Sequence, residues 1–282
     1  MIVFFNGEFV PEEKAVVSVF DRNFLYGDGL FETLRVVSGR PFRWDQHLVR
    51  LQRGIDFLGF HLPFEPGEIR GFADELIRRN RSPEAVLRIV LSRGTGPRGY
   101  SPKGAGRPVL VMSLHPARQL DQQEPPRWRL ITSSFRLQCA DPLAHFKTCN
   151  RLPQILARAQ AEASGADEAL LLNTKGEVAE TASSNLFWIE RAVVCTPPIT
   201  SGALPGVTRA LILEICAALG LPTREASARP EALPHMDGLF LTVSSWGIIE
   251  ATTLDNQQLG QSPVVQTIRE AYQETVRREC LV

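Results

Sequence analysis

The chain lacks the features that mark several classes of protein. Its 282 residues include only five cysteines, and no two of them form a Cys-x-x-Cys pair. Neither a disulfide scaffold nor a thiolate metal site is therefore indicated. The five histidines are scattered along the chain and add no metal-ligand spacing. We expect reduced, structural thiols and no bound metal.

Charge of one sign and long apolar runs are also missing. The 31 basic residues balance the 31 acidic residues, so no long-range field draws in nucleic acid or an anionic membrane. No apolar run approaches the length needed to cross a bilayer, and the start MIVFFNGEFV has no basic segment typical of a secretory signal. We expect a cytoplasmic protein whose partner is a small molecule such as an amine or amino acid.

Internal repeats and low-complexity tracts are absent as well, which argues against a solenoid and against a disordered interaction protein. Asn6-Gly7 between two apolar runs predicts a hairpin over residues 2–10. Apolar spacing and composition indicate a mixture of helices and strands. Helices are predicted over 45–58, 66–79, 151–164 and 207–219, and strands over 85–91, 108–114, 128–133, 168–172 and 185–190.

The length and one polar segment predict two domains. A chain of 282 residues can bury two cores, and the segment HPARQLDQQEPP is polar and rich in proline, as linkers are. We predict an N-terminal α/β domain over residues 1–115, a linker over 116–126, and a larger C-terminal α/β domain over 127–282 that contains Lys147. The predicted fold class is α+β.

Lysine is scarce, and the four lysines have different surroundings. Lys14 follows Pro-Glu-Glu, Lys103 lies in a loop rich in glycine and proline, and Lys175 lies in an Asn-Thr-Lys-Gly turn, which predicts solvated ammonium groups. Lys147 instead follows a His-Phe pair and precedes a predicted helix, where desolvation and the helix dipole both disfavour its protonated form. Because an uncharged lysine can attack a carbonyl group, Lys147 is the candidate nucleophile.

Three other positions have both a functional and an ordinary interpretation. Thr208 and its neighbours begin a predicted helix, where unpaired amides favour a phosphate, although any helix start offers this in part. Arg50 lies off the apolar stripe of its helix, as a solvent-facing arginine would. Glu180 by itself reads as a solvated acid at the end of a strand. The residues alone leave these alternatives open.

A long motif resembles a known family. The run KTCNRLPQILARAQAEASGADEALLLNTKGEVAETASSNLFWI, residues 147–189, is similar to the fold-type IV enzymes that depend on pyridoxal 5'-phosphate (PLP). This superfamily, the class IV aminotransferases, includes branched-chain and D-amino-acid transaminases and aminodeoxychorismate lyase. The resemblance extends from the Asn-Gly hairpin through FDRNFLYGDGLFETLRV to the SSWGI loop. It implies a two-domain fold, PLP as the cofactor, and a homodimer.

The resemblance also implies roles for individual residues. The lysine of K-x-x-N, here Lys147, forms a Schiff base with PLP, and the glutamate of E-x-x-x-S-N-L-F, here Glu180, pairs with the pyridine nitrogen. A carboxylate there keeps the nitrogen protonated, so that the ring can accept electrons. The other cofactor-binding positions that the resemblance implies, most of them around the phosphate, are Arg50, Asn185, Val207, Thr208 and Ser244.

The positions that match substrate contacts in the family are Tyr26, Phe31, Arg98, Tyr100 and Ser245. Arg98 matches an arginine that holds the substrate carboxylate in D-amino-acid transaminases, and a planar guanidinium suits that task. In those enzymes a tyrosine and a histidine complete the carboxylate site, and Phe31 and Tyr100 occupy the matching positions here. The loop after Ser245 departs from the family too, because it has Glu-Ala where many relatives have Pro-Val.

Two stretches resemble aminodeoxychorismate lyase in particular: K-x-x-N-R-L at residues 147–152, and SRGTGPRGYS at residues 92–101. We therefore expect a lyase that converts 4-amino-4-deoxychorismate into 4-aminobenzoate and pyruvate, a reaction of folate biosynthesis. Two alternatives stay open. One is a class IV aminotransferase acting on D-amino acids or branched-chain amino acids, and the other is a PLP-binding protein without catalytic activity.

Overall fold

The chain divides into two compact units, each with its own sheet. The computed structural model describes residues 1–59, 61–62, 64–118 and 126–281, so most of the predicted linker, 116–126, lies outside the described residues. Unit 1 comprises residues 1–119, 146–150 and 278–282, and unit 2 comprises residues 120–145 and 151–277. Both units combine helices with a sheet, which confirms the predicted α+β class.

Unit 1 is built on an antiparallel sheet. Within the described part of the chain its strands are β1 (Ile2–Phe5), β2 (Glu8–Pro11), β3 (Gly29–Val37), β4 (Arg40–Pro41), β5 (Ala85–Ser92) and β6 (Val109–Pro116), in the order β2-β1-β6-β5-β3-β4. Asn6 and Gly7 have φ angles of 48° and 106°. These positive angles form the tight turn between β1 and β2, as the sequence predicts.

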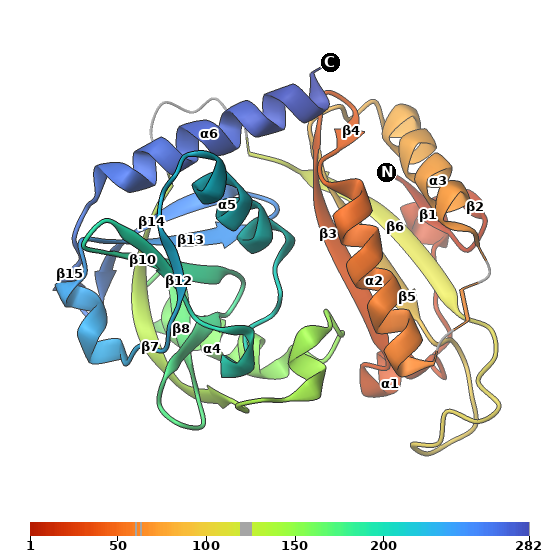
Figure 1. Cartoon of the computed structure of the whole chain (residues 1–282). Coiled ribbons are helices and arrows are strands. Elements are labelled where there is room, and N and C mark those ends of the chain that lie inside the picture. Colours follow the sequence, from red (N-terminus) through yellow and green to blue (C-terminus); the bar gives the residue numbers. More distant parts are fainter. Residues whose placement is uncertain (60, 63, 119–125, 282) are drawn as a thin grey trace. The chain divides into compact units, whose positions relative to one another are not determined.

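The helices of unit 1 are α1 (Arg22–Tyr26), α2 (Trp44–Leu58) and α3 (Pro66–Asn80), and Glu12–Lys14 forms a short 3-10 helix. Figure 1 shows α2 and α3 lying along the sheet. Their apolar faces, which include Leu51, Ile55 and Leu76, are buried in one core with the strands. Gly59 ends α2 with a φ angle of 66°. Both predicted helices are confirmed to within one residue at each end.

Unit 2 contains a larger, mixed sheet with the strand order β12-β11-β10-β13-β14-β7-β8-β9 and β15 paired to β14, for the residues that are described. Parallel pairing joins β7 to β8 and to β14, and joins β11 to β12. The strands are β7 (Arg127–Leu137), β8 (Glu168–Asn173), β9 (Val178–Thr181), β10 (Asn185–Glu190), β11 (Val193–Thr196), β12 (Thr223–Glu225), β13 (Gly238–Val243), β14 (Gly247–Leu254) and β15 (Gln257–Gln258).

The longer helices after β7 are α4 (Leu152–Ala163), α5 (Val207–Ala218) and α6 (Pro263–Cys280), and short 3-10 helices cover Pro142–His145, Ile199–Ser201 and Pro230–His235. Ala157 and Ala161 of α4 pack against Ala169 and Leu171 of β8. The predicted helices at 151–164 and 207–219 are confirmed. The strand predicted over 128–133 is longer than expected, because it continues to Leu137.

One short segment belongs to unit 1 although the sequence predicts it within the C-terminal domain. The amide of Phe31 donates to the carbonyl of Lys147, and the amide of Cys149 donates to the carbonyl of Gly29, both at 2.9 Å. Leu30 and Thr148 form an isolated β-bridge between these bonds. This pairing joins positions more than a hundred residues apart, which a local hydropathy pattern cannot reveal.

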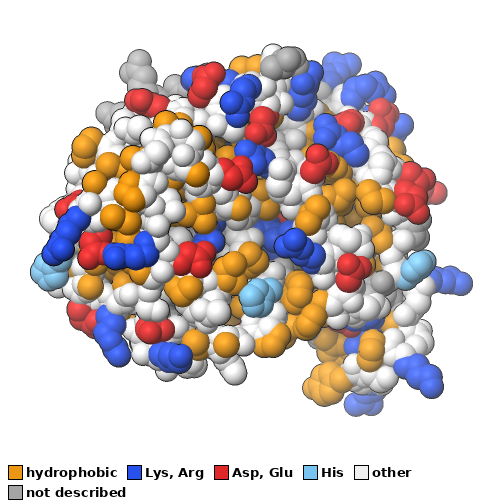
Figure 2. Space-filling model, in the orientation of Figure 1, with side chains coloured by type: hydrophobic (Ala, Val, Ile, Leu, Met, Phe, Trp, Pro, Cys, Tyr) orange, Lys and Arg blue, Asp and Glu red, His pale blue; other side chains and the backbone are white. Residues whose placement is uncertain are grey.

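The outer surface of the molecule carries no large region of one charge in the view of Figure 2. Basic and acidic side chains alternate over that face, in agreement with the balanced composition. In the portion of the chain that is described, every helix is too short or too polar to traverse a bilayer.

An acid is buried in the core of unit 2. Glu168 of β8 is fully buried, and its carboxylate accepts hydrogen bonds from the Ala169 amide at 2.8 Å and from the Ser183 hydroxyl. The guanidinium of Arg158 lies 3.7 Å from the same carboxylate. Burial raises the pKa of Glu168, and the hydrogen bonds together with Arg158 offset only part of that effect.

Glu168→Gln should therefore stabilise the fold relative to the wild type, increasingly so as pH rises. The folded-state pKa lies above the ordinary value, so the stabilising protonated form is complete at low pH and is lost as pH rises through the folded-state pKa. Urea unfolding between about pH 4.5 and pH 8 measures the difference. Glu162→Gln is the control, because Glu162 also pairs with Arg158 but is exposed and should contribute little. A wild type that is the more stable protein at pH 8 would contradict the assignment.

Candidate active site

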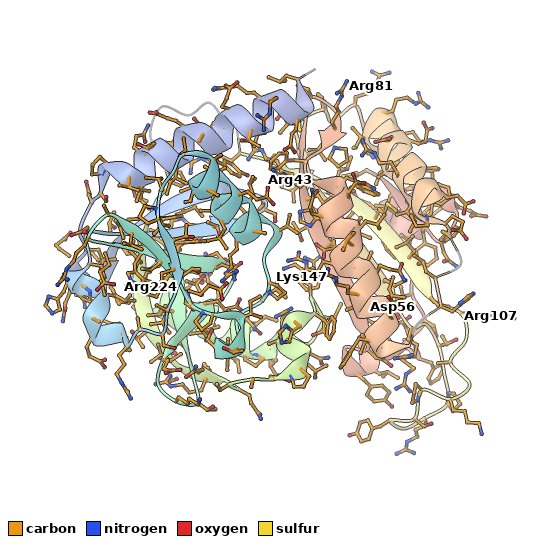
Figure 3. All side chains as sticks on the ribbon, viewed as in Figure 1. Arg43, Asp56, Arg81, Arg107, Lys147 and Arg224 are labelled. Atoms are coloured by element: carbon orange, nitrogen blue, oxygen red, sulfur yellow. The ribbon has the colours of Figure 1, made fainter. Side chains whose placement is uncertain are left out.

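Lys147 lies beside an aromatic ring of β3. Its Nζ is 4.4 Å from the centroid of the Phe31 ring, and Phe31 is 8% exposed. The guanidinium carbon of Arg88, on β5, is 4.1 Å from the same centroid. The stick view places Lys147 next to α2 (Figure 3). The amine is therefore held against an apolar ring with a second cation close by.

Arg88 is a site residue that the sequence pattern did not identify. It shares a face of β5 with Val86 and Val90, opposite the buried Leu87 and Ile89. Burial lowers the pKa of its guanidinium, and only Cys149 opposes this. Among the residues that the structure describes, no carboxylate forms an ion pair with Arg88. An arginine between two valines on a strand was the available signal, because that face is otherwise apolar.

Arg50 does not face solvent, which was the ordinary interpretation of its position. It is 9% exposed, and its Nε and Nη2 donate to the two carboxylate oxygens of Glu32 on β3 at 2.8 and 2.7 Å. His47, one turn earlier on α2, places Nδ1 2.7 Å from Glu32. A bidentate pair of this kind fixes the plane of the guanidinium. The H-x-x-R spacing puts both α2 residues on the face that meets Glu32.

The three groups of this cluster have different charges. Burial alone would raise the pKa of Glu32, but the charge of Arg50 and hydrogen bonds from Arg50 and His47 lower it to about 2. Burial lowers the pKa of His47; Glu32 opposes the shift, and the charges of Arg50 and Lys147 add to it. At neutral pH the carboxylate is therefore ionised and the imidazole is neutral, so Nδ1–H donates to Glu32. The effect of Lys147 on His47 places them in one electrostatic environment.

In unit 2, Glu180 is held by backbone and by Asn185. Glu180 is 7% exposed, and its Oε2 accepts hydrogen bonds from the Leu204 amide at 2.9 Å and from Asn185 Nδ2 at 3.5 Å. Asn185 also donates to the Leu204 carbonyl at 2.8 Å. A solvated acid at a strand end would have none of these partners. The carboxylate is instead fixed in position at the end of β9.

The start of α5 forms a small cradle. Gly206 is the N-cap residue and no side chain caps the helix, while Val207 and Thr208 are buried in the first turn. The hydroxyls of Thr208 and Ser244 are 3.3 Å apart. A Cβ at Gly206 would lie 2.0 Å from Asn185 Oδ1, so only glycine allows this approach. Amides at a helix start with two hydroxyls beside them suit a phosphate group.

The predicted substrate residues fall into separate groups. Phe31 lies against Lys147. Tyr26 of α1 instead contacts Tyr100, with ring centroids 5.7 Å apart, and Tyr100 is 87% exposed. Arg98 belongs to the same loop between β5 and β6, which extends past α1 in Figure 1. Ser245 lies in unit 2, next to Ser244. The chain therefore brings Phe31 to Lys147, whereas the loop of Arg98 is attached to α1.

Comparison with known proteins assigns the chain to a family. The sequence profile of the family described as amino-transferase class IV matches residues 29–254. The chain is 28% identical over 285 residues to the D-alanine aminotransferase of Bacillus licheniformis, covering 99% of this chain and 98% of that protein. It is 29% identical over 262 residues to the aminodeoxychorismate lyase of Bacillus subtilis, covering 92% and 88%.

Solved structures agree with this assignment. The T.th. branched-chain amino acid aminotransferase with pyridoxamine 5'-phosphate matches with a TM-score of 0.90 and 29% sequence identity, over 97% of this chain and 93% of that chain. The matches therefore include proteins with three activities on one fold. They fix the fold and the cofactor class, which is PLP.

Glu32→Gln should destabilise the protein at neutral pH, by an amount that shrinks in acid. The pKa falls from 4.5 to about 2 on folding, which corresponds to roughly 3 kcal/mol. This stability is present above the ordinary pKa and is lost as pH falls towards the folded-state value. Urea unfolding of both proteins at one protein concentration, between about pH 7 and pH 3, measures the gap.

Glu75→Gln is the matched control for that experiment. Hydrogen bonds from Arg78 and Arg79 lower the pKa of Glu75 to about 2 as well, but these pairs lie on the surface of α3, where solvent screens them. Only the Glu32 variant should show the large, pH-dependent loss. Equal effects of the two substitutions would contradict a buried ion pair as the cause.

Proposed function

Because the chain belongs to the class IV aminotransferase family, we propose that it is a PLP-dependent lyase that converts 4-amino-4-deoxychorismate into 4-aminobenzoate and pyruvate. The observation that carries the proposal is the pair of side chains next to Lys147, Phe31 and Arg88. The five cysteines are free thiols, which fits a reducing compartment. We place the enzyme in the cytoplasm, where it supplies 4-aminobenzoate for folate biosynthesis.

Residues of each unit suit one part of the cofactor. Lys147 would bond to the aldehyde carbon of PLP, and Glu180 would hold the proton on the pyridine nitrogen. PLP, when bound, supplies the electron sink for the bond that breaks at the amine-bearing carbon. Asn185 holds the Glu180 carboxylate in place. The phosphate would be bound by the first turn of α5, by hydroxyls and by a guanidinium, from Val207, Thr208, Ser244 and Arg50.

The charges around Lys147 favour a substrate with a carboxylate beyond the amine-bearing carbon. Phe31 has no hydroxyl with which to hold a carboxylate near the reacting carbon. Arg88 is half-buried, burial disfavours its charged form, and a substrate carboxylate would restore the balance of charge. 4-Amino-4-deoxychorismate carries one carboxylate on its ring and another on the enolpyruvyl group. Arg98 would bind the second carboxylate.

The chain's own groups then account for the proton transfers. Lys147, once the substrate amine has replaced it on the cofactor, takes the proton from the amine-bearing ring carbon. The bond from the neighbouring ring carbon to the enolpyruvyl oxygen breaks, and its electrons leave with that oxygen. The ring becomes aromatic, and the departing enolpyruvate takes up a proton to become pyruvate. Aromatisation provides the driving force.

An aminotransferase is the second candidate. The similarity to D-alanine aminotransferase over 99% of the chain favours it, and a dicarboxylic amino acid would also give Arg88 a counter-ion. The two reactions differ in where the proton goes after Lys147 has removed it. A transaminase returns it to the cofactor carbon and releases an oxo acid, whereas the lyase needs a leaving group next to the amine-bearing carbon.

We also propose that the enzyme is a homodimer. Several large apolar side chains of unit 1 are exposed in the single chain, among them Val16, Phe20 and Phe24 at 72%, 66% and 67%. Leu152 and Ile155 of α4 are likewise 63% and 61% exposed. Exposed apolar groups of this density mark interfaces. Sedimentation should give twice the 31.3 kDa mass of the chain, and a monomer would contradict the proposal.

The purified holoenzyme, given 4-amino-4-deoxychorismate, should release 4-aminobenzoate and pyruvate in equal amounts. Lys147→Ala should abolish this turnover and the covalent attachment of PLP. Arg88→Gln should raise KM about tenfold, the effect of one lost charge-assisted contact, whereas the exposed Arg53→Gln should not. Rapid conversion to the pyridoxamine form by D- or L-amino acids, without any 4-aminobenzoate, would replace the lyase by the aminotransferase. No turnover of any amine would leave a binding protein.

A further inference from the structure

One buried guanidinium holds the exposed loop between β5 and β6. Arg22 of α1 is 3% exposed. Its Nη1 donates to the carbonyls of Gly99 and Ser101 at 3.0 and 3.1 Å, and its Nη2 donates to the carbonyl of Tyr100 at 3.1 Å. Three consecutive carbonyls of the loop are therefore bound by a single side chain. All three lie directly after Arg98.

The guanidinium is itself fixed from the other side. Its Nε donates to Asp28 at 2.8 Å, and its carbon lies 5.2 Å from the centroid of the Tyr26 ring. Arg93 donates to the same Asp28 oxygen at 2.8 Å. Burial alone would raise the pKa of Asp28, but the hydrogen bonds from Arg93 and Arg22 outweigh it and lower that pKa. Asp28 therefore stays ionised and anchors both arginines.

The loop has few other means of keeping its shape. Gly94 and Gly99 have φ angles of 85° and 107°, which glycine alone adopts at low cost but which leave the unfolded loop many alternatives. Tyr100 is mostly exposed, and the Gly99 amide reaches the Tyr26 hydroxyl only at 3.4 Å. Most of the order of residues 98–101 thus depends on contacts to α1.

We propose that Arg22 is a positioning residue: it fixes the backbone after Arg98 and so sets where that guanidinium meets the substrate carboxylate. This inference rests on the proposed function, in which Arg98 binds a carboxylate. A lysine could not replace Arg22, because a single ammonium cannot span three carbonyls and a carboxylate, whereas the planar fork of arginine can. Arg22 acts through Arg98 and does not touch the substrate itself.

Limited trypsin digestion of the holoenzyme tests the clamp without reference to activity. The loop offers cleavage after Arg98 and after Lys103, and mass spectrometry identifies each cut. Arg22→Lys and Arg22→Gln should both speed these cuts about tenfold, since the loss of charge-assisted hydrogen bonds favours the open loop by that factor. Arg93→Gln is the matched control, because Arg93 binds the same aspartate but donates to the Leu58 carbonyl instead. It should leave cleavage after Arg98 near the wild-type rate.

Steady-state kinetics then separates this inference from the proposed function. Arg22→Lys should raise KM about tenfold with a smaller change in kcat, and should add nothing when Arg98 is already glutamine. Unchanged cleavage in both Arg22 variants would overturn the clamp. Faster cleavage with unchanged KM, in variants of Arg22 and of Arg98 alike, would overturn the assignment of Arg98 to the substrate and with it the positioning role. The absorbance of bound PLP should match the wild type, as the clamp lies outside the cofactor residues.

Discussion

The pairing of residues 147–149 with β3 is the interaction on which the candidate site depends. Two backbone hydrogen bonds of 2.9 Å tie this segment to Gly29 and Phe31, so the lysine is fixed by main chain and not by its own flexible side chain. Glycine is needed at both nearby positions of the Gly-Asp-Gly motif. A Cβ at Gly27 would lie 2.5 Å from Asn150, and one at Gly29 would lie 2.7 Å from the Leu91 carbonyl.

This attachment sets the electrostatics around the amine. Glu32 is the anion of the cluster, and Arg50 binds it with two nitrogens. The neutral His47 adds no charge, while Arg88 and Lys147 both lie against Phe31. A chain without net charge therefore concentrates cations at one place, where an anionic cofactor and a carboxylate substrate would bind. Composition alone could not reveal that concentration, since the compensating acids lie elsewhere on the surface.

The sequence predicts what local patterns determine. The hairpin at Asn6-Gly7, the helices α2 and α5 and the glycine that ends α2 follow from turn chemistry and apolar spacing. Motif resemblance led to Glu180, and the structure gives that carboxylate the buried, hydrogen-bonded environment that a solvated acid would lack. Arg88, Glu32 and Arg22 could not be ranked in this way. Their partners lie far along the chain, and a single charged residue in a strand or helix is ambiguous until the sheet register is known.

The division of residues between the two units suggests how one fold can serve several reactions. The phosphate cradle and Glu180 belong to unit 2 and address groups that every PLP enzyme must hold. Phe31, Arg88 and the loop of Arg98 belong to unit 1 and would address the substrate, which differs between lyase and aminotransferase. Because these side chains project from the edges and loops of a stable sheet, their replacement changes which carboxylates fit without disturbing the core. Specificity in this family member is then a property of a few unit 1 side chains and of the contacts, such as those of Arg22, that hold them in place.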